Sequence, residues 1–171
     1  MTESLIVVRG PIGVGKSSVS KGLQRGLPHA SFIETDVLKH MAGPDGSSPW
    51  RRRIAHDTSA FMVQQLLKVP RTAIIEVHTK YPEEVDRYAA MAADLSVPSV
   101  NVLLTAPLEV CRERTVNRPM PGVVYEPDYS LVDAYYCNLE PQPGDLVYDT
   151  TNLGATAIVA DILNNIEQPS S

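Results

Sequence analysis

The sequence predicts an α/β protein in which a parallel sheet carries helices on both faces. Short apolar or β-branched runs alternate with longer helical segments along the chain, which is the pattern of βαβ units. The first run, residues 5–8, is continuously apolar, as expected of a central strand that is buried on both faces. A glycine-rich stretch joins this run to a helix. We find no internal repeat and no second domain, so residues 1–171 are expected to form one domain.

The remaining elements follow from local patterns in chain order. Further strands are predicted from apolar runs at residues 31–34, 72–77, 99–105 and 146–148. Helices are predicted from apolar spacing and from proline and glycine signals, at residues 17–25, 36–41, 50–69, 82–94, 107–118, 128–139 and 155–166. The helix at 50–69 has Ile54, Phe61, Leu66 and Leu67 among its apolar positions. A loop at about 43–49 is expected to be mobile, and a tail at about 167–171 to be disordered.

Composition and charge exclude several classes of partner. Hydrophobic residues make up 43% of the chain and charged residues 20%, which is ordinary for a soluble globular protein. A net charge of −5 disfavours a nucleic-acid partner. The first apolar run is too short to target or cross a membrane, so no membrane partner is expected. Two cysteines without a metal-ligand spacing indicate a reduced, cytoplasmic location, and the oligomeric state is left open.

The glycine-rich stretch reads Gly-Pro-Ile-Gly-Val-Gly-Lys-Ser and satisfies the Walker A pattern G-x-x-x-x-G-K-[ST]. The glycines let the backbone curl so that its N–H groups point at phosphate oxygens, and the next helix adds the positive end of its dipole. Lys16 is expected to reach the β- and γ-phosphates, and Ser17 to supply a hydroxyl to Mg²⁺. The predicted triphosphate contacts of this ATP or GTP site are Gly10, Pro11, Ile12, Gly13, Val14, Gly15, Lys16, Ser17 and Ser18.

This loop, the segment Ile-Glu-Thr-Asp at 33–36 and the segment Cys-Arg-Glu-Arg-Thr-Val-Asn-Arg at 111–118 together resemble the small P-loop kinases of the nucleoside monophosphate kinase-like group. That group includes chloramphenicol phosphotransferase, the kinase domain of polynucleotide kinase, adenylylsulfate kinase and shikimate kinase. The resemblance implies a three-layer fold whose five-stranded parallel sheet has the order 2-3-1-4-5, with a short lid at about 112–128. It also implies phosphoryl transfer from ATP or GTP.

Asp36 is the candidate general base because it follows the second strand, and ligands gather at the carboxyl ends of parallel strands. A carboxylate there can accept a hydroxyl proton and orient the attacking oxygen, and related kinases place an aspartate at this position. The alternative is that Asp36 is only a helix cap. Lys39 is a candidate acceptor contact that stands where many relatives have arginine. This departure argues against a bidentate grip on an acceptor phosphate.

Glu76 ends an apolar strand, where an acid orients Mg²⁺ or its waters in P-loop enzymes; the alternative is a buried, hydrogen-bonded carboxylate. His78 lies two residues after Glu76 and therefore on the same face of the strand. It is interpreted either as an acceptor contact or as a polar residue that ends the strand. Three consecutive arginines at 51–53 point in directions about 100° apart around a helix, so at most two can face one ligand. Arg53 is the candidate acceptor contact among them. The alternative is that all three arginines belong to a solvated first turn of the helix. Trp50 is expected either to stack on an acceptor or to pack.

Arg114 and Arg118 are four residues apart and project from one face of the predicted lid helix. The resemblance implies that one stacks near the base and the other stabilises the transferring phosphate; the alternative is surface ion pairing with Glu109 and Glu113.

Two further groups of candidates follow the lid helix. Tyr125 and Tyr129 belong to an acidic and aromatic stretch that suits an amphipathic or cationic small molecule, or that forms an ordinary helix with half-buried tyrosines. The resemblance implies that Thr151 and Asn152 flank the adenine; the alternative is a cap for the last helix.

The residues together predict a small-molecule kinase that moves the γ-phosphoryl group of ATP or GTP to an acceptor hydroxyl. An antibiotic or a nucleoside-like metabolite is the expected acceptor class. A kinase for nucleoside monophosphates or other phosphorylated metabolites is the second candidate, because the arginines at 51–53 and Arg87 could supply phosphate contacts. A nucleotide-binding switch or NTPase, which would need a positioned water in place of an acceptor pocket, is the third.

Overall fold

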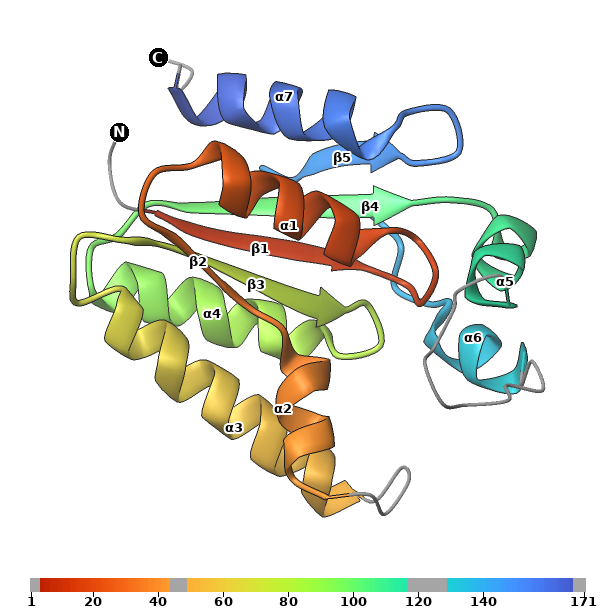
Figure 1. Ribbon diagram of the computed structural model, residues 1–171, viewed down its shortest axis with the longest axis horizontal. Coiled ribbons are helices and arrows are strands. Elements are labelled where there is room, and N and C mark those ends of the chain that lie inside the picture. The colour runs from red at the N-terminus through yellow and green to blue at the C-terminus, as the bar shows by residue number, and fades with distance from the viewer. Residues whose placement is uncertain (1–3, 44–48, 117–128, 168–171) are drawn as a thin grey trace.

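The computed structural model describes residues 4–43, 49–116 and 129–167 (Figure 1). Five strands form one all-parallel sheet in the order β2-β3-β1-β4-β5. The strands are β1 (Leu5–Gly10), β2 (Ala30–Ile33), β3 (Thr72–His78), β4 (Ser99–Thr105) and β5 (Leu146–Asp149). The predicted fold class and strand order are therefore confirmed.

Four long helices make the two outer layers, and shorter helices lie at the carboxyl ends of the strands (Figure 1). One face is covered by α1 (Lys16–Gly26) and α7 (Ala155–Glu167), and the other by α3 (Pro49–Leu66) and α4 (Pro82–Asp94). Three shorter helices lie near the carboxyl ends of the strands: α2 (Thr35–Met41), α5 (Leu108–Val116) and α6 (Tyr129–Tyr135). Ligands of open parallel sheets bind at this edge.

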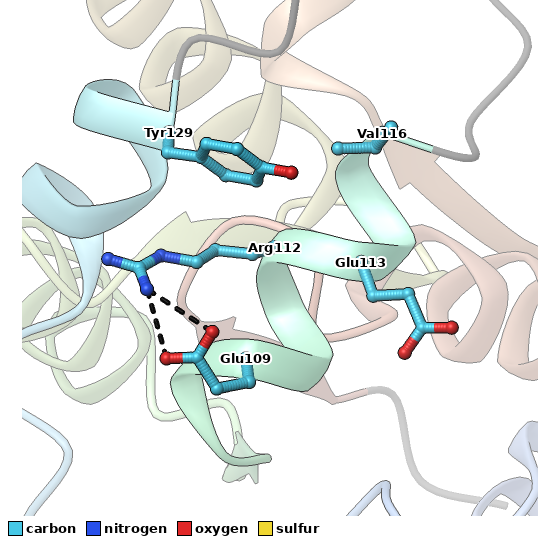
Figure 2. A pocket seen from close by; sticks show the side chains of 5 residues that line it. All are labelled: Glu109, Arg112, Glu113, Val116 and Tyr129. Carbon is cyan, nitrogen blue, oxygen red and sulfur yellow. Dashed lines mark hydrogen bonds and ion pairs between the residues drawn. The ribbon is translucent and has the colours of Figure 1, made fainter.

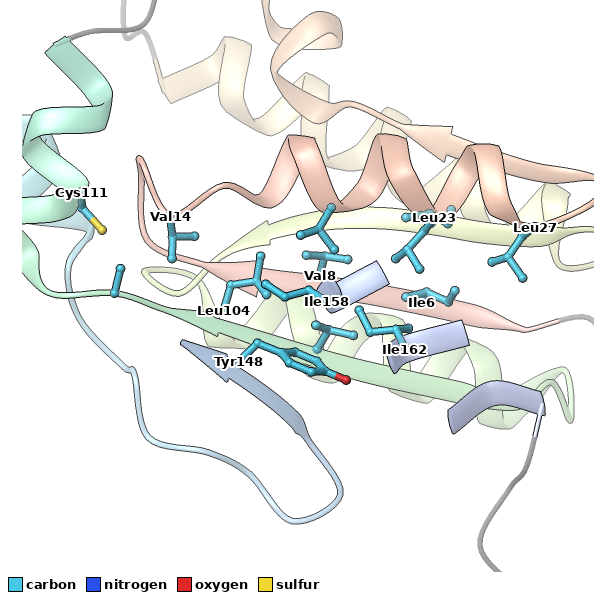
Figure 3. Packing of buried hydrophobic residues seen from close by; sticks show 14 of the residues in the cluster. Ile6, Val8, Val14, Leu23, Leu27, Leu104, Cys111, Tyr148, Ile158 and Ile162 are labelled. Carbon is cyan, nitrogen blue, oxygen red and sulfur yellow. The ribbon is translucent and has the colours of Figure 1, made fainter. Parts of the chain in front are cut away.

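The core has two parts because β1 is buried on both faces. Ile6 and Val8 pack with α1 and α7, and Figure 3 shows this cluster reaching Cys111 of α5. Leu5 and Val7 face the other way and pack with α3 and α4. Both cysteines are free, with Cys111 buried and Cys137 half-buried. No helix in the described ranges is long and apolar enough to span a bilayer.

The helix α3 packs through its small residues. Its buried stripe runs through the small residues Ala55, Ser59 and Ala60, while Ile54 and Phe61 are 48% and 63% exposed. Small side chains bring the helix close to the sheet, so its larger apolar residues are left at the surface.

Several predicted boundaries shift by a few residues. Glu34 is the N-cap of α2, so the expectation that Asp36 caps this helix is wrong; Asp36 lies in the first turn. The first strand continues through Arg9, which is buried and pairs with Asp145. The helix predicted at 128–139 ends at Tyr135. Most of the expected mobile loop, the distal part of the expected lid and nearly all of the tail lie outside the described residues.

Candidate active site

The glycine-rich loop curls between β1 and α1 as its sequence predicts. Gly13 and Gly15 have φ angles of 82° and 102°, in the region that glycine tolerates best. A Cβ atom on Gly13 would lie 2.2 Å from the Cys111 carbonyl oxygen, so only glycine fits against α5. Gly15 is the N-cap of α1, and its carbonyl accepts from the backbone N–H groups of Ser18 and Val19. The loop is therefore shaped by glycine to hold its backbone around an anion.

Lys16 lies folded back into this loop and is 7% exposed. Its Nζ donates to the carbonyl oxygens of Gly10 at 3.0 Å and Pro11 at 2.8 Å, and lies 3.3 Å from Nδ1 of His78. An ammonium has only donors, so Nδ1 of His78 accepts and the ring proton sits on Nε2. Burial and the charge of Lys16 hold the pKa of His78 well below its usual value.

Ser17 and Glu76 meet beside the loop, with Ser17 Oγ donating to Glu76 Oε2 at 3.2 Å. Glu76 Oε1 is buried without a hydrogen-bond partner among the described residues. Burial raises the pKa of Glu76, while the charge of Lys16 and the neighbouring hydroxyls of Ser20 and Ser17 oppose the rise. A hydroxyl and an unsatisfied carboxylate oxygen are ligands that fit Mg²⁺. No group of three metal-binding side chains occurs in the described ranges, so the remaining ligands would be phosphate oxygens and water.

Arg114 is tied to the loop after β5. Its Nη1 and Nη2 donate to the side-chain and backbone oxygens of Thr150, at 2.8 and 2.7 Å. Thr150 Oγ1 in turn donates to the carbonyl of Val14 at 2.9 Å. Thr150 was not among the predicted site residues, because its place beside Thr151 is a weak local signal. Arg118, the second predicted lid arginine, lies outside the described residues.

The predicted adenine contacts, Thr151 and Asn152, are exposed at the same edge. The backbone N–H of Thr151 donates to Asp149 Oδ1 at 2.8 Å, and α7 begins only at Ala155. These residues form a turn ahead of α7. The first hydrogen bonds of α7 are instead accepted by Gly154, whose carbonyl accepts from the backbone N–H groups of Ala157 and Ile158.

Asp36 is exposed on α2 and lies near enough to Tyr135 that its charge contributes to the raised pKa of that hydroxyl. The charge of Lys39 likewise helps to lower the pKa of His78. The predicted base thus lies near Tyr135, and the predicted Lys39 contact lies near His78. Arg51, which is buried, donates to the Lys39 carbonyl at 2.8 Å and supports this part of α2.

A wall of four side chains closes this side of the site: Arg52, His78, Tyr81 and Tyr135, called the tyrosine wall below. Arg52 Nη1 donates to the Tyr81 hydroxyl at 2.7 Å, and the hydroxyls of Tyr81 and Tyr135 lie 2.9 Å apart. His78 meets the Tyr135 ring edge-on, with ring centroids 5.0 Å apart. Through His78, the wall reaches Lys16. Of these four residues, the sequence predicted His78 as a site residue and included Arg52 in the arginine cluster at 51–53, whereas Tyr81 and Tyr135 were not predicted.

Two predicted acceptor contacts lie apart from the wall. Arg53 is largely exposed and pairs with Asp57 one turn along α3, so the arginine that joins the wall is Arg52. Trp50 is 47% exposed at the start of α3 and is not part of the core.

Tyr129 lines a separate cavity between α5 and α6, of about 460 Å³. Figure 2 shows Tyr129 beside Arg112, which reaches down to Glu109. Arg112 also pairs with Asp133 at 2.7 Å and holds the pKa of that carboxyl below its usual value. This cavity shares no lining residue with the tyrosine wall. Tyr125, the other predicted aromatic contact, lies outside the described residues.

Comparison with known proteins agrees with this geometry. Residues 5–135, well over half of the chain, match the family described as AAA domain. The chain belongs to this family. No curated protein sequence matches the chain significantly.

Solved structures of several kinases have the same fold as this AAA-domain protein. The APS kinase of Mycobacterium tuberculosis, in complex with AMPPNP and APS, aligns with a TM-score of 0.75 at 18% identity, over 97% of this chain and 98% of that one. A gluconokinase from Sinorhizobium meliloti 1021 aligns with a TM-score of 0.65 at 21% identity, over 99% of each chain. A tunicamycin resistance protein from Deinococcus radiodurans aligns with a TM-score of 0.61 at 20% identity, over 96% and 95%. The fold is that of the small P-loop kinases.

Proposed function

We propose that the protein is a small-molecule kinase that transfers the γ-phosphoryl group of ATP or GTP to an acceptor hydroxyl, with Asp36 as the general base. The observation that carries this proposal is convergence at one sheet edge. The glycine-rich loop with Lys16 follows β1, Asp36 follows β2, and His78 at the end of β3 lies between them in contact with Lys16. Triphosphate and acceptor would thus meet where the strands end.

Each residue has a defined task in this proposal. Lys16 exchanges its two carbonyl partners for the β- and γ-phosphates, and the N–H groups of the loop hold the phosphate oxygens. Ser17 and Glu76 would hold Mg²⁺, which neutralises phosphate charge when bound. Asp36 accepts the proton of the acceptor hydroxyl and orients its oxygen toward the phosphorus.

The structural neighbours support this assignment. The structure of the APS kinase is a complex with AMPPNP, a triphosphate analogue, and with APS. The gluconokinase name also denotes phosphorylation of a hydroxyl compound. The tunicamycin resistance protein keeps hydroxylated antibiotics among the acceptors to be tested.

The structure gives less support to a kinase for phosphorylated metabolites. Such an enzyme needs several arginines on the acceptor phosphate, but Arg51 supports α2 and Arg53 pairs with Asp57. Arg87 pairs with Asp57 and Glu84 on the outer surface. Of these four arginines, Arg52 alone joins the tyrosine wall.

The function is tested by measuring ADP and free phosphate with Mg-ATP, in the presence and absence of hydroxylated antibiotics, nucleosides and sugars. A kinase forms ADP in proportion to an added acceptor. Phosphate release that no acceptor changes would instead identify an NTPase. Lys16→Ala should abolish turnover because it removes the charge at the transferring phosphates, whereas Lys68→Ala, at an exposed position after α3, should not. Near wild-type turnover in Lys16→Ala would refute the phosphate-loop assignment.

A further inference from the structure

The end of β3 lies directly beside the start of the phosphate loop. In the parallel pairing of β1 with β3, Gly10 stands opposite His78. Ile74 packs in the core cluster under α1, and because side chains alternate along a strand, His78 points to the same face of the sheet. Lys16 begins α1 on that face. The register of the sheet therefore brings the ring of His78 to the side chain of Lys16.

The ammonium of Lys16 has three N–H donors and no acceptor. Its Nζ donates to the carbonyl oxygens of Gly10 and Pro11 and lies 3.3 Å from Nδ1 of His78. The two carbonyls belong to the loop that would hold the phosphates, whereas His78 belongs to the sheet. When two of the donors turn to the β- and γ-phosphates, as proposed above, a third donor is left for Nδ1 of His78.

The ring of His78 is itself held in place. It meets the Tyr135 ring edge-on, with ring centroids 5.0 Å apart and an interplanar angle of 82°. The next residue, Thr79, is buried. Its backbone N–H donates to the Gly10 carbonyl at 3.4 Å, and its hydroxyl donates to the Tyr135 carbonyl at 3.2 Å. These contacts tie the end of β3 to both the phosphate loop and α6, so Nδ1 of His78 is an acceptor at a fixed place.

We propose that His78 is a positioning residue for Lys16: its Nδ1 keeps one N–H of the ammonium and thereby aims the other two at the triphosphate. An imidazole nitrogen suits this task because it is a neutral acceptor. A carboxylate in the same place would offset the positive charge that binds the phosphates, whereas Nδ1 orients the ammonium and leaves its charge intact. This inference rests on the nucleotide site of the proposed function, and it differs from the predicted role of His78 as an acceptor contact.

The test separates the nitrogen of His78 from its ring. His78→Asn keeps an acceptor, because Oδ1 of asparagine can replace Nδ1, but it loses the ring beside Tyr135. His78→Phe keeps the ring and loses the acceptor. We expect His78→Phe to raise the Kd of Mg-AMPPNP about tenfold, as for the loss of a hydrogen bond to a charged group, and His78→Asn to stay within about threefold of wild type.

Isothermal titration calorimetry measures these affinities without an acceptor, so they do not depend on whether transfer is observed. The Kd of Mg-ADP should change less in His78→Phe, because ADP lacks the γ-phosphate to which one donor is aimed. His29→Asn is the matched control, because His29 is an exposed histidine ahead of β2 whose φ angle of 58° asparagine tolerates. It should bind both nucleotides like wild type.

A role of His78 in packing alone predicts the opposite order, with His78→Phe close to wild type and His78→Asn weakened. That order would overturn the inference and leave the kinase proposal standing. Tighter AMPPNP binding in His78→Phe would also overturn it, since His78 would then hold Lys16 away from the phosphates. A wild-type protein that does not bind AMPPNP would refute both the inference and the phosphate-loop assignment.

Nitrogen NMR of the histidine side chains tests the contact in the wild-type protein without a substitution. Nδ1 of His78 should keep the chemical shift of a hydrogen-bonded acceptor when Mg-AMPPNP is added. A move of this signal to the position of a free acceptor would show that Lys16 leaves His78 on binding, and would overturn the inference.

Discussion

Asp36 is the residue on which the distinction between nucleotide binding and phosphoryl transfer depends. It is exposed in the first turn of α2 and is not the N-cap, so its side chain is available to an acceptor. We expect Asp36→Asn to preserve nucleotide affinity and to lower acceptor phosphorylation by roughly 10²-fold, the usual scale for a positioned base. Initial rates of ADP formation and nucleotide titrations measure the two quantities.

Asp86→Asn is the matched control, because Asp86 is an exposed aspartate on α4. A loss of only two- or threefold in Asp36→Asn would show that Asp36 is not the base. Equal losses in both variants would point to a general charge effect.

Glu84 supports the tyrosine wall through His56. Its Oε1 lies 3.2 Å from Nδ1 of His56, and His56 packs edge-on against Tyr81. The hydrogen bond from His56 is the main cause of the lowered pKa of Glu84. A carboxyl whose folded pKa lies below its unfolded value stabilises the fold above the unfolded value, near 4.5, and loses that contribution as pH falls through the folded value.

We therefore expect Glu84→Gln to lower the free energy of unfolding at pH 7 by about 0.5–1 kcal/mol. The difference from wild type should shrink below pH 4.5, as urea unfolding across pH 3–7 would measure. Glu83→Gln, at the exposed neighbouring position, should change little. A Glu84→Gln difference that stays constant over this pH range would contradict the assigned role.

At the scale of elements, Thr150 connects three parts of the site. Its oxygens accept hydrogen bonds from Nη1 and Nη2 of Arg114 on α5, and its hydroxyl donates to the carbonyl of Val14 in the phosphate loop. Thr150→Val keeps the shape of the side chain but leaves the Val14 carbonyl and one Arg114 donor without this partner. We expect KM for ATP to rise about tenfold, and kcat for phosphorylation of the acceptor to change less.

Thr150→Ser should restore most of the nucleotide affinity because it returns the hydroxyl. Thr156→Val, at an exposed position of α7, controls for the loss of a surface threonine. Equal KM values for ATP in Thr150→Val and Thr156→Val would show that the phosphate loop does not depend on this contact.

The phase of α3 determines which of its arginines joins the tyrosine wall. Arg51, Ala55, Ser59 and Val63 follow one another at four-residue intervals and form the buried stripe. Arg52 is turned about 100° from Arg51 and Arg53 about 200°, so Arg53 lies nearly opposite Arg51. Ile54 and Phe61 are exposed, and the spacing of the small residues is the sequence signal for this phase.

Across the whole molecule, features that depend on local sequence were predictable. The apolar runs of β1, β3 and β4 predicted buried parallel strands. The pattern from Gly10 to Ser17 predicted a curled loop between a strand and a helix, because glycine spacing and the lysine are local signals.

Contacts between distant parts of the chain were not predictable in this way. Tyr81 and Tyr135 meet across 54 residues, and Thr150 meets Val14 across 136 residues. Neither pair has a local signature, because tertiary packing alone brings the two members together. The shape of the nucleotide loop was thus accessible from sequence, whereas the tyrosine wall and the Thr150 bridge required the structure.

The central claim, that a bound triphosphate is used for transfer to a hydroxyl, is tested most directly by following the γ-phosphoryl group itself. Phosphorus NMR would show where that group goes. The sample contains Mg-ATP, the wild-type protein and an acceptor that stimulates ADP formation in the screen. The account predicts an acceptor phosphate-ester signal that grows in step with ADP and is absent with Lys16→Ala. Growth of inorganic phosphate alone, at the same rate with and without acceptor, would contradict it.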